Sequence, residues 1–364
     1  MSAQEQAIPA NPPPRRSMFG GLMARIGAAL MRMRALVALA ALVLLFSILT
    51  PSFFTANNLS ILTRHVSINA LLAIGMTFVV IGGGIDLSVG SVAGFSGMVA
   101  GALITRGIVV TGMAHPWYPG VWFVIVVALA AGALVGAVNG LLIAWFNVAP
   151  FIATLGTLYM ARGAALLLSG GRTFPDLGGD PTRHNTGFPS LGQGHWLGIS
   201  IPIWIMVLLA LAAQLLATRT VFGRHVYATG GNARAAMLSG IRTGRVRFMS
   251  YLLSGICAAM AGILIAAQLE AAHPATGESF ELTAIAAVVL GGTSLQGGRG
   301  SVLGSLAGAF VIGTLADGLV MLGVSEFWQI VIKGLVIVLA VILDQAQSGL
   351  HTRLRLAFLR GQPE

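Results

Sequence analysis

Long apolar segments alternate with short polar ones along most of the chain, and this alternation predicts helices that cross a membrane. A helix needs about 20 apolar residues to span ~30 Å of hydrocarbon, and several segments reach or approach that length. Ten candidates can be counted: Ala35–Leu49, Val66–Ile81, Val92–Thr105, Val121–Phe146, Pro150–Leu168, Ile201–Ala217, Phe248–Leu269, Leu282–Leu290 with its glycine-rich continuation, Val302–Leu322 and Phe327–Leu343. The pattern therefore predicts an all-α, polytopic membrane protein with about ten transmembrane helices.

The same pattern divides the chain into three parts. Residues 1–34 are rich in Pro, Ala and Arg, and we expect a disordered, basic lead on the cytoplasmic side. Residues 35–345 form the predicted transmembrane domain, and residues 346–364 a cytoplasmic tail. Hydrophobic residues make up 56% of the chain and charged residues 9%, against about 25% charged in soluble domains. This composition excludes an ordinary soluble enzyme.

Charge fixes the expected orientation. The polar stretch 218–247 contains six arginines and no acidic residue. Membrane loops rich in Lys and Arg stay on the cytoplasmic side, so we place this stretch in the cytoplasm. An even number of spans then puts both basic termini there too, with residues 169–200 as the longest outer loop. The net charge of +10 is explained by this asymmetry, so no nucleic-acid partner is expected.

Two sets of glycines recur at every fourth position within apolar segments. Such spacing lets helix backbones approach closely in lipid, so we expect tight helix packing here and no cofactor. The two sets are Gly132, Gly136 and Gly140, and Gly300, Gly304 and Gly308.

A polar break, Gly82–Ser91, interrupts one long apolar run. Asp86 and Ser88 are good N-cap residues for a following helix, which is one interpretation of the break. The other is that the break lines a polar path or contacts a cytoplasmic partner, because irregular backbone at membrane depth needs protein or water around it. Further uncharged candidates for a polar path within the apolar segments are Asn69, Asn139, Thr154 and Thr157.

Three charged residues lie inside predicted spans: Arg162, Asp317 and Lys333. Intramembrane charge is costly and indicates a functional site by default, but long side chains near a span end can also snorkel or pair. Asp317 and Lys333 each lie eight positions from Ser325, at roughly 12 Å below a predicted turn. We therefore expect an ion pair between them.

The chain has no recognisable catalytic or nucleotide-binding motif. Its single lysine, Lys333, is followed by Gly334 and Leu335, whereas a P-loop needs Gly-Lys-Ser/Thr because the lysine reaches the nucleotide phosphates. If ATP drives its work, another polypeptide must bind it. The sequence does not predict an enzyme.

Four separated segments resemble the permease subunits of ribose- and xylose-type ABC sugar importers. They are Gly83–Ser91, Pro150–Thr157, the pair Tyr227–Asn232 and Leu238–Ile241, and Ala284–Leu295 followed by Gly297-Gly298. The similarity runs from about residue 35 to about residue 345. Thr283 follows Glu281-Leu282 where many relatives have Asp, so the resemblance leaves the sugar open among ribose-like pentoses, hexoses and polyols.

The resemblance implies a multi-pass permease of the bacterial inner membrane, with the type II, vitamin-B12-importer-like architecture. It implies a second permease copy, most simply as a homodimer, a periplasmic sugar-binding protein, and a cytoplasmic ATP-binding cassette subunit that binds ATP and Mg²⁺. It also places the contact with that ATPase in the arginine-rich stretch. The residues that match there are Gly230, Gly231, Asn232, Ala235, Ala236 and Gly240.

An ion-coupled secondary transporter of a small polar solute is the alternative. It would need a coupling carboxylate near the midplane, often within a broken helix, and Asp86 is the only candidate. A membrane-embedded enzyme is a third possibility, and the missing catalytic cluster counts against it.

Overall fold

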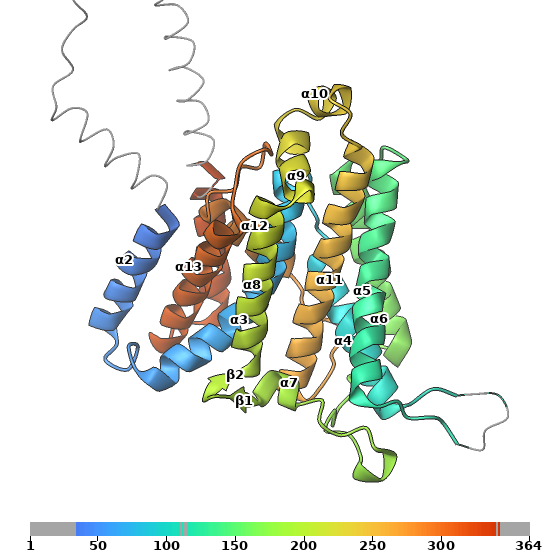
Figure 1. Ribbon diagram of the computed structural model, residues 1–364. Helices are drawn as coiled ribbons and strands as arrows, with labels where there is room; N and C mark the ends of the chain where they lie inside the picture. The colour runs from blue at the N-terminus through green and yellow to red at the C-terminus, as the bar shows by residue number, and fades with distance from the viewer. Residues whose placement is uncertain (1–33, 110, 112–114, 340, 343–364) are drawn as a thin grey trace, which may run out of the picture.

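The computed structural model describes residues 34–342 apart from residues 110, 112–114 and 340. Helices run side by side from one end of the molecule to the other (Figure 1). In chain order they are α2 (Arg34–Leu49), α3 (Ala56–Ile81), α4 (Val89–Thr105), α5 (Val121–Ala144), α6 (Pro150–Ser169), α7 (Ser190–Gln193), α8 (Ile201–Arg219), α9 (Val221–Gly231), α10 (Ala233–Leu238), α11 (Thr243–Leu269), α12 (Phe280–Leu290) and α13 (Val302–Met321). One more helix covers residues 326–339.

Strand is confined, in the described part, to one small hairpin. It pairs β1 (His195–Trp196) with β2 (Ile199–Ser200), near the short 3₁₀ helix η1 (Pro181–Arg183). The prediction of an all-α protein is thus confirmed for this part of the chain. The predicted lead, residues 1–34, and the tail, residues 346–364, lie outside the described residues except for Arg34.

Six described helices are long and apolar enough to cross a membrane: α3, α5, α6, α8, α11 and α13. Three shorter apolar helices, α2, α4 and α12, accompany them. The molecule is therefore a multi-pass membrane protein. Several helices extend beyond the predicted apolar segments: α3 begins at Ala56 and α11 at Thr243, because their first turns are polar and hydropathy alone excludes them.

Polar N-caps set the starts of several helices. The hydroxyl of Thr55 accepts the amide of Asn58 at α3, and that of Thr220 accepts the amide of Gly223 at α9. Asn232 caps α10 and Ser301 caps α13 in the same way. Each cap satisfies one of the four backbone donors that a helix start leaves free.

The central helix α11 packs against α3, α4 and α5. A side chain on Gly132, Gly136 or Gly140 of α5 would overlap or crowd α11, mainly at Ala259, Gly255 and Phe248. The predicted close packing of this glycine set is confirmed. For the second set, Gly304 and Gly308 of α13 meet backbone of α12 and its C-cap in the same manner, whereas Gly300 precedes the helix.

At two places in the bundle, turns and irregular chain take the place of helix. Residues 82–88 join α3 to α4 at the end that carries α9 and α10, and residues 270–279 join α11 to α12 from the opposite end (Figure 1). A Cβ on Gly90, in the first turn of α4, would overlap the carbonyl oxygen of Gly277, so the second region reaches the start of the helix that follows the first.

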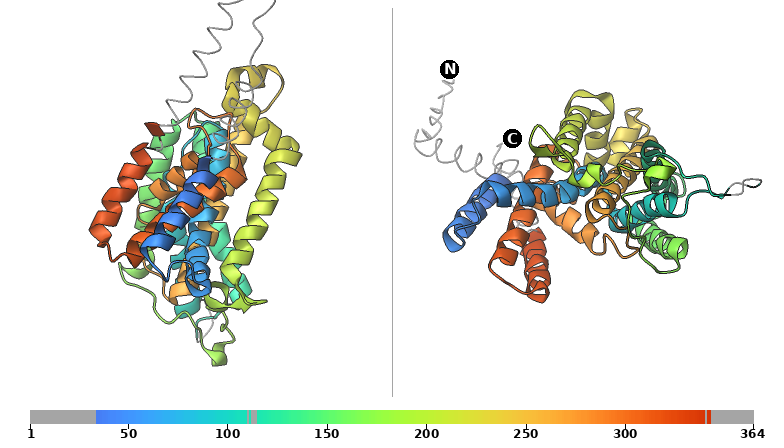
Figure 2. Two further views of the ribbon diagram at one scale, coloured as in Figure 1. Left: turned by 90° about the vertical axis from the view of Figure 1, so that its left-hand side faces the viewer. Right: turned by 90° about the horizontal axis from the view of Figure 1, so that it is seen from below.

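The peripheral helices lie on two flanks of this centre. α2 and the C-terminal helices occupy one side, and α5 and α6 the other (Figures 1 and 2). The glycine-rich continuation predicted for the eighth span is a turn rather than helix, since α12 ends at Leu290 and α13 begins at Val302.

Candidate functional site

Two short helices, α9 and α10, project from one end of the bundle and form the middle of the arginine-rich stretch 218–247 (Figure 1). Five of its six arginines are exposed. At the tip, Met237 and Leu238 of α10 are 59% and 81% exposed. An exposed apolar tip with a basic surround is suited to bind a protein surface.

Among the residues predicted to contact the ATPase, exposure separates two groups. Gly231, Asn232, Ala235 and Gly240 are exposed, whereas Ala236 is buried. Ala235 and Ala236 are neighbours on α10 but differ in exposure: the side chain of Ala235 faces outward, and that of Ala236 lies on the buried side of the helix.

Gly230 belongs to a junction of three glycine-containing segments. A Cβ there would overlap the carbonyl oxygen of Ile81, at the end of α3, and would lie 2.6 Å from the amide nitrogen of Gly298. The amide of Gly298 donates to the same Ile81 carbonyl at 2.8 Å. A Cβ on Gly297 would likewise lie 3.0 Å from Cα of Gly83. The C-terminal end of α9 thus contacts both the 82–88 break and the turn before α13.

A tyrosine strengthens this junction. The Tyr227 hydroxyl of α9 donates to the carbonyl oxygen of Gly300 at 2.9 Å. Burial raises the pKa of Tyr227 above its ordinary value, because the phenolate is poorly solvated there. The hydroxyl accordingly keeps the proton that this hydrogen bond requires.

A buried chain of hydrogen bonds fixes the 82–88 break. One oxygen of Asp86 accepts the amide and hydroxyl of Ser88 at 2.9 and 2.6 Å, and the other accepts the Ser254 hydroxyl of α11 at 2.8 Å. The Asn139 amide of α5 donates to the Ser88 hydroxyl at 2.9 Å, and the Thr157 hydroxyl of α6 donates to Asn139 at 2.6 Å. The break is thereby bound to three neighbouring helices.

The structure brings together five of the six predicted polar-path residues. Asp86, Ser88, Asn139, Thr154 and Thr157 are all buried; the Thr154 hydroxyl donates to Pro150 of its own helix, and its carbonyl also lies 3.1 Å from the Thr157 hydroxyl. Asn69 lies elsewhere on α3, half-buried. The capping interpretation is refined: Ser88 precedes α4 without a side-chain cap, and its own amide is bound by Asp86. Ser254 was missed, since a serine in an apolar helix gives no sequence signal.

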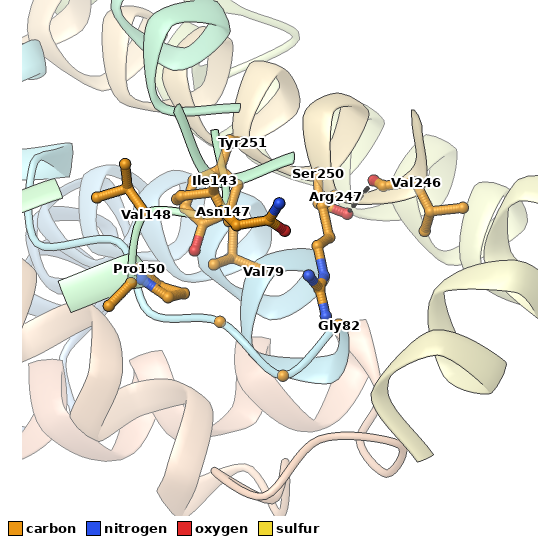
Figure 3. A pocket seen from close by; sticks show the side chains of 13 residues that line it. Val79, Gly82, Ile143, Asn147, Val148, Pro150, Val246, Arg247, Ser250 and Tyr251 are labelled. Carbon is orange, nitrogen blue, oxygen red and sulfur yellow. Dashed lines mark hydrogen bonds between the residues drawn. The ribbon is translucent and has the colours of Figure 1, made fainter. Parts of the chain in front are cut away.

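A cavity of about 210 Å³ lies beside the break (Figure 3). It is lined by the end of α3 with Gly82–Gly84, by residues 147–150 between α5 and α6, and by the first turns of α11. Arg247 extends along it toward Gly82, and Asn147 and Ser250 add polar groups (Figure 3). Its lining contains no acidic residue, so it offers hydrogen-bond donors and one positive charge at the arginine-rich end.

The three predicted intramembrane charges have different surroundings. Arg162 of α6 donates to the carbonyl oxygens of Pro274 and Thr276, at 2.5 and 2.8 Å, and so does not snorkel. Asp317 of α13 accepts the side-chain amide of Asn58 at 3.0 Å. Lys333 is half-buried on the helix 326–339.

The expected ion pair between Asp317 and Lys333 is absent. Within the described residues the structure has one ion pair, Arg183 to Asp180 at 3.4 Å in the loop between α6 and α8. The physical reason is the orientation of α13, which turns Asp317 toward the first turn of α3 rather than toward the helix 326–339.

Comparison with known proteins gives a consistent result. Residues 58–341 match the family model described as "Branched-chain amino acid transport system / permease component". The chain is 44% identical to the ribose import permease protein of Bacillus subtilis (strain 168) over 335 residues, covering 92% of this chain and 97% of that protein.

Other relatives are less similar. The ribose import permease of Escherichia coli (strain K12) is 41% identical over 88% of this chain and 95% of its own length. The xylose transport system permease of the same strain is 34% identical, over 85% and 91%. No solved structure matches the chain.

Proposed function

The chain belongs to the family of branched-chain amino acid transport system permease components, and we propose that it is the permease subunit of an ATP-driven sugar importer, with ribose as first candidate substrate. The observation that carries this proposal is 44% identity to a ribose import permease over nearly the full length of both chains. Identity falls to 36% for a D-allose permease and 34% for a xylose permease, which favours ribose over these two sugars.

The partner ATPase would bind at α10. Its exposed apolar tip, Met237 and Leu238, and the surrounding arginines support this assignment. Gly231, Asn232, Ala235 and Gly240 would lie in the contact, while Gly230 and Ala236 would hold α9 and α10 in place from beneath. ATP and Mg²⁺ would be bound by that partner, and sugar would be delivered by a periplasmic binding protein to a pair of permease copies.

The number of apolar helices supports ten spans, and an even number puts both termini on the same side, which we assign to the cytoplasm. Counting the three shorter helices and residues 326–339 with the six long ones gives ten, as a type II permease would have. Reporter fusions at residues 185 and 232 are then expected on opposite sides of the membrane. Finding both on one side would exclude this topology.

Sugar would leave through the cytoplasmic cavity between α3, α11 and the α5–α6 loop. Arg247, Asn147 and Ser250 supply groups that can bind sugar hydroxyls, and residues 82–84 supply a backbone wall. The buried chain from Asp86 to Thr157 supports a positioning role for those residues, because it holds this wall in place.

Uptake of labelled ribose tests the function. The chain would be expressed with its own ATPase and binding protein in a strain that lacks a ribose permease, and unlabelled ribose, allose and xylose would compete. We expect saturable ribose uptake that disappears when the ATPase cannot hydrolyse ATP. If labelled ribose, allose and xylose are each supplied and none is taken up, a sugar importer of this substrate class is refuted.

The same assay addresses the ion-coupled alternative. Asp86, the coupling carboxylate that the sequence suggested, accepts three hydrogen bonds in a buried site, which does not suit repeated ion binding and release. Uptake that survives loss of the ATPase but collapses with the proton gradient would favour a secondary transporter.

A further inference from the structure

Residues 270–279 form a strap that enters the bundle from the end opposite α10. At its entrance, Ala272 exchanges two backbone hydrogen bonds with Phe174, and the amide of Leu177 donates to Glu270. Further in, the strap packs on small residues of α4. A Cβ on Gly94 would lie 2.5 Å from the carbonyl oxygen of Thr276, and one on Gly90 would overlap that of Gly277.

The depth of the strap follows from its neighbours. Gly97 of α4 packs against Gly262 of α11, which lies seven residues before that helix ends at Leu269. Gly90, against which Gly277 of the strap packs, lies another seven residues toward the N-terminus of α4. At 1.5 Å per residue these two steps of seven residues place Gly277 up to about 20 Å inside the end of α11. The strap therefore reaches about the middle of a 30 Å hydrocarbon layer.

Arg162 is the side chain that holds the strap from α6. Its guanidinium binds the carbonyl oxygens of Pro274 and Thr276, two backbone groups that need a partner at this depth because the strap is not helical. Glu278 and Glu281 lie close enough to interact with it electrostatically. A charge buried in this position is retained only where it has such partners.

The opposite face of the strap is exposed. Ala275, Glu278 and Ser279 are exposed in the chain taken alone. A carboxylate and a hydroxyl at this depth cannot face hydrocarbon without a large cost. This face must therefore border water or another polar surface rather than lipid.

We propose that the exposed face of residues 275–279 lines the route of the sugar through the membrane and that Arg162 is the positioning residue for this wall. The inference rests on the proposed function, since it assumes that this chain conducts a hydroxylated solute. Glu278 and Ser279 would offer hydrogen-bond partners for sugar hydroxyls. Arg162 itself faces the strap backbone and does not need to touch the sugar.

Cysteine labelling in the assembled importer tests the wall. The native Cys257 is buried, so the unmodified chain gives the background. Ala275→Cys, Glu278→Cys and Ser279→Cys would be compared with Leu208→Cys, using a small, water-soluble, membrane-impermeant methanethiosulfonate. Leu208 is 63% exposed and lies on an apolar face of α8. We expect the strap positions to react at least about tenfold faster, because thiolate forms poorly in apolar surroundings. Equal rates would overturn the proposal.

Substitution of Arg162 tests its positioning role. Arg162→Gln is expected to change the labelling rates along the strap and to lower maximal ribose uptake, while Arg162→Lys restores part of both. Arg172→Gln, an exposed arginine in the loop after α6, is the matched control for charge loss, and permease amounts are compared in isolated membranes.

Two outcomes separate the inference from the proposed function. Unchanged labelling and uptake in Arg162→Gln would refute the positioning role while ribose uptake by the unmodified importer stands. A lack of ribose uptake by the unmodified importer would refute the proposed function instead, and the labelling comparison with Leu208→Cys would still decide whether the strap borders water.

Discussion

Gly230→Ala is expected to destabilise the permease through a single added methyl group. The new Cβ would overlap the carbonyl oxygen of Ile81 and lie 2.6 Å from the amide nitrogen of Gly298. Both neighbours are backbone atoms that already bond to each other at 2.8 Å, so no side chain can rotate away. α9 would have to shift, and the hydrogen bond of Tyr227 to Gly300 would be strained with it.

The magnitude can be bracketed with a matched variant. Overpacking against fixed neighbours costs typically about 1–3 kcal/mol, while alanine in place of glycine in a helix gains up to about 1 kcal/mol. Gly231 is the next residue of the same helix and has open space where its Cβ would stand. Because Gly231→Ala receives a similar helical gain without the overlap, the difference between the two variants isolates the overlap, at about 1–3 kcal/mol.

The assay is unfolding of the purified permease in mixed detergent micelles, followed by far-ultraviolet circular dichroism. Gly230→Ala should unfold at a lower concentration of denaturing detergent than the unmodified chain, and Gly231→Ala at the same or a higher one. A difference between the variants below about 0.5 kcal/mol, the usual range for surface substitutions, would refute the packing argument at this junction.

Three further predictions concern α10 and the buried polar residues. Ala235→Trp should leave the permease folded but uncouple ATP hydrolysis from uptake, whereas Ala236→Trp should reduce the amount of folded permease, because only the second side chain is buried; normal uptake in both would contradict this. Asp86→Asn should lower the free energy of unfolding by about 1–3 kcal/mol, since an amide cannot accept all three hydrogen bonds; an unchanged unfolding midpoint would count against it. Asp317→Asn and Lys333→Met should act additively on stability, and a coupling above about 0.5 kcal/mol would reveal an interaction that the geometry does not contain.

Hydropathy predicted most of the helices because each one must bury or expose an apolar surface in lipid. It failed at polar helix starts. Residues 56–65 include Asn57, Asn58 and Arg64, and the start of α11 includes Arg245 and Arg247, yet both regions are helical. Caps such as Thr55, together with packing against neighbouring helices, extend these helices beyond the apolar region.

The two breaks differ in how far sequence reveals them. Gly82–Gly84 and Asp86 interrupt an apolar run, so a break at membrane depth was predictable. Residues 270–279 follow a complete apolar helix and contain Pro and polar residues, which is also the pattern of an outer loop. Their depth depends on two distant features, the small residues Gly90 and Gly94 of α4 and the arginine of α6, and no local pattern contains that information.

The candidate coupling surface, α10, and the 82–88 break are connected through atoms in contact. α10 continues from α9 through Asn232, and α9 rests on Ile81 and Gly298 through Gly230. Ile81 is the last residue before the segment that Asp86 fixes to α11 and, through Ser88 and Asn139, to α5 and α6. A displacement of α10 that moves α9 would reach the break through the Gly230 contact, because this contact bears directly on Ile81 at the end of α3. If Gly230→Ala lowered stability yet left ATP-driven uptake per folded permease unchanged, the route from α10 to the membrane interior would have to run through α8 or α11 instead.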